Sequence, residues 1–152
     1  MNLTAKEYLN QAYHLDRQAE MLIAKAEKLR SSLYGKGVSY DGSKVKGGTG
    51  GDLSDTVAQV IEYEQQSADV IKKLIGKRIE IERVIAAVPD ADQREVLERR
   101  YLLYQPWETF FDKRTGQKVT GIDEAMNYSA RQIYRFHGKA LQKVENLVSE
   151  CQ

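Results

Sequence analysis

The sequence predicts an all-α protein, with a long antiparallel helical hairpin over residues 1–88 and a small helix-turn-helix domain over residues 89–152. Three observations predict this fold. Two long segments repeat apolar residues at steps of three and four, which is the spacing of coiled-coil helices. A stretch that holds seven of the chain's 11 glycines separates these segments. The C-terminal part then combines a short helix, a tight turn and a longer basic helix.

The first helix is predicted to begin at a capping box, in which the side chains of Thr4 and Glu7 accept each other's backbone amides. From there apolar residues continue for nearly four heptads, while the residues between them are largely charged. The helix is therefore expected to present one coiled-coil seam. The seam positions are Tyr8, Ala12, Leu15, Ala19, Leu22, Ala26, Leu29 and Leu33.

The glycine-rich stretch at 35–51 has almost nothing to bury, so a flexible loop is expected there. Phosphate binding is not expected, because a Walker-type loop ends in Lys followed by Ser or Thr, whereas Asp52 and Leu53 follow this one.

A second long helix is predicted from Asp52 to Val88, ending before Pro89. Four further apolar residues widen its seam, so either the C-terminal half or a second copy of the chain is expected to pack there. The seam is predicted at Leu53, Val57, Val60, Glu64, Ser67, Ile71, Leu74, Arg78, Ile81, Ile85 and Val88, and the widening residues are Ile61, Ala68, Ile75 and Ile79.

A third helix is expected to begin at Asp90, with Gln93 completing the cap, and to reach about Tyr104. Residues 107–120 leave two alternatives open. One is a short β-hairpin that turns at residues 113–116, and the other is a short helix that starts at Pro106.

The last third of the chain predicts a helix-turn-helix. Residues 122–126 form a short apolar-faced helix, the next two form the bend, and Ser129 caps a final helix that reaches about Ser149. From Ser129 to Val144 there are four basic residues and no acidic one, although the net charge of the chain is only +1. The alternative interpretation is that residues 129–149 form a solvated amphipathic helix in which the excess of basic residues arises by chance. The residues expected to face DNA are Ser129, Arg131, Gln132 and Arg135, with Lys139 and Lys143 on phosphates.

Three segments carry a family resemblance: residues 94–101 (REVLERRY), Trp107-Glu108, and residues 128–141 (YSARQIYRFHGKAL). They resemble the DNA-binding fourth region of bacterial sigma factors. They resemble still more a small family of phage and prophage proteins from Gram-positive bacteria, related to the ArpU-like late transcription regulators. Residues 6–16 of this chain also resemble the opening of that family's sequences. In such sequences the Trp-Glu pair leads within a few residues into the first helix of the motif. Here about a dozen residues look inserted, either as a wing that touches DNA or as an obstacle to docking.

The resemblance implies a sequence-specific transcription regulator whose partners are double-stranded DNA and RNA polymerase. The coiled-coil seam adds the expectation of a homo-oligomer. Two other functions remain open: a small terminase-like DNA-packaging subunit, and a coiled-coil structural or adaptor protein that binds no DNA.

An enzyme is not expected, because no nucleophile–base pair, carboxylate pair or metal-ligating cluster stands at usable spacing. His14 and His137 lack convincing partners, and Cys151 is the single cysteine, so neither a metal nor another cofactor is expected. The sequence has no run of eighteen apolar residues and no secretion signal. We therefore expect a protein of the bacterial cytoplasm that has no membrane partner.

Overall fold

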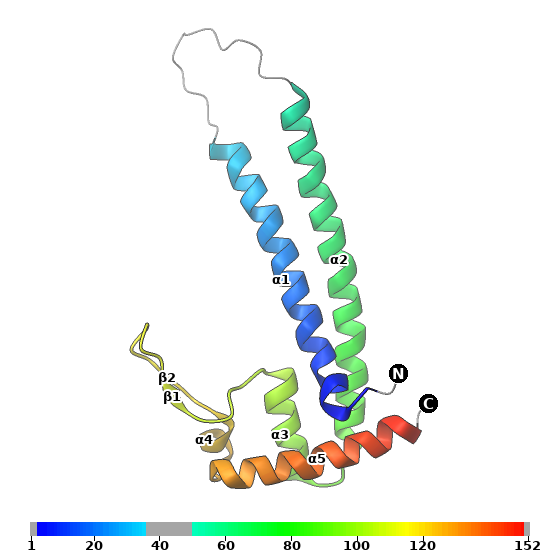
Figure 1. Cartoon of the computed structure of the whole chain (residues 1–152), viewed down its shortest axis with the longest axis vertical. Helices are drawn as coiled ribbons and strands as arrows, with labels where there is room; N and C mark the ends of the chain where they lie inside the picture. Colours follow the sequence, from blue (N-terminus) through cyan, green and yellow to red (C-terminus); the bar gives the residue numbers. More distant parts are fainter. Residues whose placement is uncertain (1–2, 36–49, 151–152) are drawn as a thin grey trace. The chain divides into compact units, whose positions relative to one another are not determined.

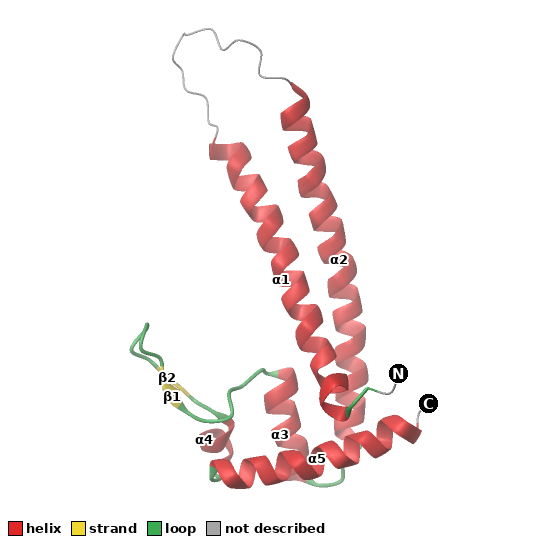
Figure 2. Ribbon diagram, in the orientation of Figure 1, coloured by secondary structure: helices red, strands yellow, loops and turns green. Residues whose placement is uncertain are grey.

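The computed structural model describes residues 3–35 and 50–150, and most of them are helical (Figures 1 and 2). The predicted all-α class with a short β-hairpin is confirmed. The predicted loop at 35–51 lies largely outside the described residues. In chain order the elements are α1 (Ala5–Gly35), α2 (Gly50–Ala86), α3 (Ala91–Leu97), the π-helix η1 (Glu98–Leu102), β1 (Phe110–Phe111), β2 (Lys118–Val119), α4 (Ile122–Met126) and α5 (Ala130–Glu150).

The described chain forms two compact units. One contains the residues up to His14 together with those from Ile75 onward, and the other contains Leu15–Leu74. No helix among residues 3–35 and 50–150 is long and apolar enough to cross a membrane.

In the unit Leu15–Leu74, α1 and α2 run antiparallel and side by side (Figure 1). Ala19 and Ala26 of α1 are buried, and so are Val60 and Val70 of α2. Small alanines let the two helices approach closely. An ion pair between Arg30 and Glu64 and a cation–π contact of Lys25 with Tyr63, at 5.7 Å, join the same helices.

The predicted seam of the second helix is wrong in its N-terminal half, where Leu53, Val57 and Glu64 are exposed. Val57 was expected inside but is 41% exposed, whereas Val70, outside the predicted seam, is buried. The prediction is confirmed at the other seam positions that are buried, namely Val60, Ser67, Leu74, Ile81, Ile85 and Val88. The cause is that α2 carries two apolar stripes at similar spacing, and α1 covers only one of them.

In the other unit, the capping box at the start of α1 is confirmed. The Thr4 amide donates to Glu7 Oε2 at 2.9 Å, and the Glu7 amide donates to Thr4 Oγ1 at 3.3 Å. The predicted cap of the third helix is confirmed as well, because the Gln93 amide donates to Asp90 Oδ1 at 2.9 Å. That helix changes into the π-helix η1 after Leu97, which the sequence pattern did not predict.

Residues 107–120 contain a β-hairpin, so the alternative of a helix from Pro106 is wrong. Phe110 pairs with Val119 in the antiparallel register, and Phe111 pairs with Lys118. At the turn the Gly116 amide donates to the carbonyl of Asp112 at 2.8 Å, and Gly116 has φ +69°, a conformation that glycine adopts without strain.

Candidate nucleic-acid interface

The helix-turn-helix is held by a small core to which α3, α4 and α5 each contribute one fully buried residue. These residues are Val96, Ile122 and Ile133, with Trp107, Met126 and Phe136 packed around them. Because the buried face of α5 is fixed on this core, its opposite face is turned to solvent. The core therefore determines which side chains of α5 are available to a partner.

The turn between α4 and α5 consists of three residues, which is the length typical of a helix-turn-helix. Asn127 is left-handed (φ 56°, ψ 43°) and ends α4, and the Tyr128 amide donates to the carbonyl of Asp123 at 3.0 Å. Ser129 caps α5 as predicted, since its Oγ accepts the Gln132 amide at 3.3 Å. Its hydroxyl is therefore already engaged at the N-terminus of α5.

The other residues predicted to face DNA differ in how far their side chains are exposed to solvent. Arg131, Arg135, Lys139 and Lys143 are exposed, whereas Gln132 is half-buried. Four residues advance a helix by about 400°, so each basic residue stands about 40° round the axis from the one before it. The basic stripe thus begins with two arginines at the N-terminal end of α5 and winds toward one flank with the two lysines.

The four basic side chains of α5 are unpaired. Within the part of the chain that the structure describes, none of them forms a salt bridge or a side-chain hydrogen bond. Their positive charge is therefore not compensated locally.

Arginines of the preceding helices are engaged within the fold instead. Arg94 donates to the carbonyl of Val88 at 2.7 Å, Arg99 pairs with Glu95 at 2.7 Å, and Arg100 donates to the carbonyl of Gln105 at 3.1 Å. Arg100 also lies over the Trp107 ring at 4.7 Å. The same residue type thus stabilises the fold on α3 and η1 and remains available on α5.

Sequence reasoning missed Gly138, which lies on the exposed face of α5 among the basic residues. A Cβ at this position would meet nothing within 4 Å. Glycine inside a helix costs about 1 kcal/mol relative to alanine. The absence of a side chain at Gly138 leaves the helix backbone open on this face. In the sequence, Gly138 could have been noticed because glycine is unfavourable inside a helix and this one interrupts a strongly amphipathic segment.

His137 belongs to the core side of α5 and not to the basic stripe. Its Nε2 hydrogen-bonds with the Tyr101 hydroxyl at 2.9 Å, and its ring lies 4.6 Å from that of Trp107. Burial, aided by the nearby charges of Lys6 and Arg100, lowers the pKa of His137 to about 4. Burial likewise raises the pKa of Tyr101 to about 12. Both groups are therefore neutral at physiological pH.

The inserted hairpin is closed at its base by a network that we call the neck, made by residues 106–109 and 121–123. Thr109 donates to Asp123 Oδ1 from both its amide and its hydroxyl, each at 3.0 Å. The Gly121 amide donates to Thr109 Oγ1 at 2.9 Å, and the Ile122 amide donates to the carbonyl of Pro106 at 2.9 Å. These hydrogen bonds bring the end of the segment that follows η1 next to the start of α4, and the hairpin projects from this point.

The hairpin leaves the basic stripe uncovered. In Figure 1 it rises on the same side of α5 as α3, and the four basic side chains of α5 are all exposed. The hairpin tip carries Lys113 and Arg114, which are exposed too. The insertion therefore does not cover the face of α5 that carries the stripe.

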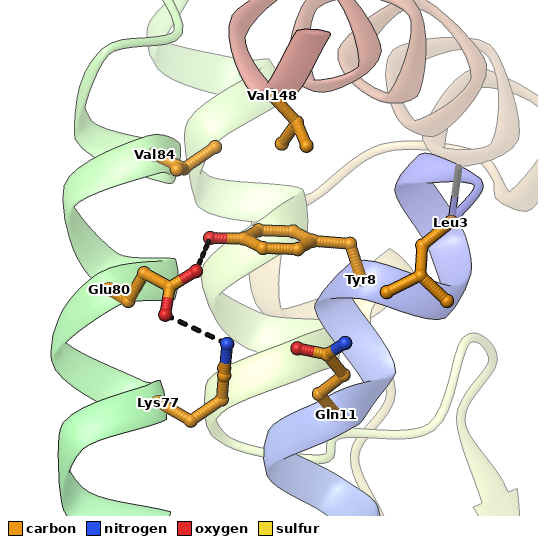
Figure 3. Close-up of a pocket in the computed structure, with 7 residues that line it drawn as sticks. All are labelled: Leu3, Tyr8, Gln11, Lys77, Glu80, Val84 and Val148. Carbon is orange, nitrogen blue, oxygen red and sulfur yellow. Dashed lines mark hydrogen bonds and ion pairs between the residues drawn. The ribbon is translucent and has the colours of Figure 1, made fainter. Parts of the chain in front are cut away.

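A pocket of about 320 Å³ lies where the start of α1, the end of α2 and the end of α5 meet (Figure 3). Tyr8 donates to Glu80 at 2.8 Å, and Lys77 pairs with the other oxygen of the same carboxylate at 2.8 Å. The hydrogen bond from Lys77 contributes most to lowering the pKa of Glu80, against the opposing effect of burial. Sequence reasoning missed this cluster, because it placed Tyr8 among apolar seam residues. The Tyr8 hydroxyl and the Lys77 ammonium both bind the Glu80 carboxylate and so join the start of α1 to the end of α2. Gln11 Oε1 in the same lining is buried and has no hydrogen-bond partner among the residues that the structure describes.

No group of three or more His, Cys, Asp or Glu side chains that could hold a metal occurs in residues 3–35 and 50–150. Comparisons with models of protein families, with curated proteins and with solved structures find no match for this chain. The family resemblance of residues 6–16 and of the segments within 94–141 therefore stays a prediction.

Proposed function

We propose that this protein binds double-stranded DNA through α5 and acts as a sequence-specific transcription regulator. In this proposal the N-terminal end of α5 enters the major groove, where Arg131 and Arg135 reach base edges. Lys139 and Lys143 contact phosphates. The hairpin of α1 and α2 contacts a second copy of the chain or RNA polymerase.

The observation that carries the proposal is the unpaired basic stripe on the second helix of a helix-turn-helix. Lys139 and Lys143 stand about 80° and about 120° round the helix axis from Arg131. That winding suits a helix whose first turns face the bases while later turns meet the backbone at the edge of the groove. Half-buried Gln132 is the weakest of the proposed contacts, because only part of its side chain reaches solvent.

The first test is a salt titration of binding to random-sequence duplex DNA. Each phosphate contact adds about 0.9 to the slope of log affinity against log salt. The double variant Lys139→Ala/Lys143→Ala, which removes both proposed phosphate contacts, is expected to bind more weakly and to lower the slope by about 1 to 2. A matched control that also removes two positive charges, Lys73→Ala/Arg83→Ala, should leave the slope unchanged. Absence of binding at low salt, or equal losses in both double variants, would overturn the proposal.

Sequence specificity is tested at a site selected from a random duplex library. Arg131→Ala is expected to cost about 1–3 kcal/mol at that site and to relax the preference for one base pair. Lys143→Ala should instead weaken binding to all sequences alike. If both variants behave as the wild type, α5 does not read DNA.

The number of copies separates a regulator from a packaging subunit. A two-fold dimer suits a regulator that binds two half-sites, whereas a ring of about eight or more copies suits a terminase-like subunit. Light scattering of the purified protein with and without DNA distinguishes the two.

A further inference from the structure

A second apolar stripe runs along α2, outside the seam that packs on α1. Ile61 is 49% exposed and Ile75 is 55% exposed, and Val57 and Ile79 are exposed to a similar extent. Soluble proteins carry scattered exposed apolar residues without consequence. A regular series on one face of one helix is different, because it is the pattern of a helix–helix contact.

The residues of the stripe share one face of the single helix α2 (Gly50–Ala86). At about 100° per residue, its members all point within about 40° of the direction of Ala68. It extends over about 33 Å, from the first member to the last. The members are Val57, Ile61, Glu64, Ala68, Lys72, Ile75 and Ile79, all of them exposed.

The stripe is also symmetric about Ala68 in the character of its residues, since apolar residues pair with apolar ones and an acidic residue pairs with a basic one. Its residues stand in pairs at equal separations on either side of Ala68, namely Val57 with Ile79, Ile61 with Ile75, and Glu64 with Lys72. Two antiparallel helices related by a two-fold axis at Ala68 would therefore place apolar residues opposite apolar residues. They would also place each Glu64 opposite a Lys72, and the small Ala68 where the backbones come closest.

The charge of α2 agrees with this arrangement. Residues 50–69 carry five acidic and no basic side chains, whereas residues 70–86 carry five basic and two acidic ones. An antiparallel pair sets unlike halves against each other, and a parallel pair sets like halves together. Glu64 already pairs with Arg30 of its own chain, but its side chain remains 45% exposed, and a carboxylate accepts several hydrogen bonds.

We propose that a second copy of this chain packs on this stripe, with the two α2 helices antiparallel about a two-fold axis at Ala68. A contact of this kind is isologous, because the same patch serves both partners. The self-complementary order of the stripe favours a copy of this chain over an unrelated helix, which would not require a palindrome. The contact does not depend on DNA binding and is tested without DNA.

The first experiment compares two charge reversals on neighbouring exposed lysines by sedimentation velocity over a range of concentrations. Lys72→Glu places a carboxylate opposite Glu64 twice per dimer, and it is expected to weaken dimerisation at least tenfold. Lys73→Glu makes the same charge change about 100° further round the helix and should have less than a twofold effect. In a parallel dimer, Lys72→Glu would exchange one like-charge pair for another, with no net effect.

Mixing provides a control for folding. Glu64→Lys and Lys72→Glu chains should each dimerise poorly alone, and an equimolar mixture should form heterodimers because both cross-pairs become oppositely charged. Recovery in the mixture shows that the single variants are folded.

The position of the axis is tested by crosslinking in a Cys151→Ser background, which removes the single cysteine. Ala68→Cys is expected to form a disulfide between copies under mild oxidation, whereas Asp69→Cys, one residue along and turned about 100° away, should not. A monomer at about 100 μM, equal effects of the two lysine reversals, or equal crosslinking of the two cysteine variants would each overturn the proposal.

Discussion

Replacing Gly121 by alanine is expected to destabilise the helix-turn-helix by about 2 kcal/mol, although the backbone there suits any residue. Gly121 has φ −88° and ψ 177°, which is ordinary extended geometry. The obstacle is space, because a Cβ would lie 2.3 Å from the carbonyl carbon of Glu108 and 2.5 Å from the amide nitrogen of Thr109. Both atoms belong to backbone, so no side chain can swing aside.

The magnitude follows from the neck. Moving the Cβ from 2.3 Å to 3.4 Å, the start of ordinary contact, requires a shift of about 1 Å. Such a shift stretches the hydrogen bonds at 2.9–3.0 Å between Thr109 and its partners Gly121 and Asp123 beyond useful length. Losing two or three of them costs about 1 kcal/mol each. The smaller entropy of the unfolded alanine variant offsets about 0.4–1 kcal/mol.

The assay is urea unfolding followed by the fluorescence of Trp107, the one tryptophan of the chain, which packs against the helix-turn-helix core. The matched control is Gly138→Ala on α5, where the new methyl group meets nothing within 4 Å. That variant is expected to gain about 1 kcal/mol from helix propensity. The two variants should therefore shift the midpoint in opposite directions. Wild-type stability, or a gain, in Gly121→Ala would refute the reasoning about the neck.

Two further predictions concern α5. The pKa of His137 is about 4 in the folded protein, against an ordinary value of 6.5. Between these two pH values the unfolded chain is protonated at His137 and the folded chain is not. Stability should accordingly fall as the pH drops from about 6.5 to about 4, and His137→Gln should flatten this dependence in urea titrations, with an unchanged pH profile as the contrary result. Gly138→Ala should weaken DNA binding about fivefold, or about 1 kcal/mol, because its methyl group stands on the face proposed to meet DNA. Gly76→Ala on α2, equally open, should leave DNA affinity alone, and equal affinities for the two variants would remove Gly138 from the interface.

Local signals along this chain proved reliable. The capping residues Thr4, Asp90 and Ser129 were identified from the sequence because a cap depends on side chains within three residues of one another. The hairpin was only one of two alternatives, since Pro106 suits a helix start and Gly116 suits a turn. The contacts of Thr109 with Asp123 decide between them, and these residues lie 14 positions apart.

Contacts between residues far apart in the sequence could not be predicted from the sequence. Both stripes of α2 have the spacing of a seam, so periodicity alone cannot tell which of them α1 covers. The exposed stripe of α5 was predictable, because a four-residue basic repeat opposite an apolar face requires no knowledge of the fold. The environment of His137 was not, because Tyr101 and Trp107 come to it from other segments.

The neck closes the β-hairpin at its base, between η1 and α4. Hydrogen bonds join the chain before Thr109 to the chain after Gly121. The hairpin that they enclose also contacts α4 through the exposed ion pair of Lys118 with Glu124 at 2.5 Å. A change in the length of the hairpin or in its tip residues therefore leaves the hydrogen bonds of the neck in place. The same closure makes the tip at residues 113–116 a natural place to graft an epitope or a fluorescent reporter.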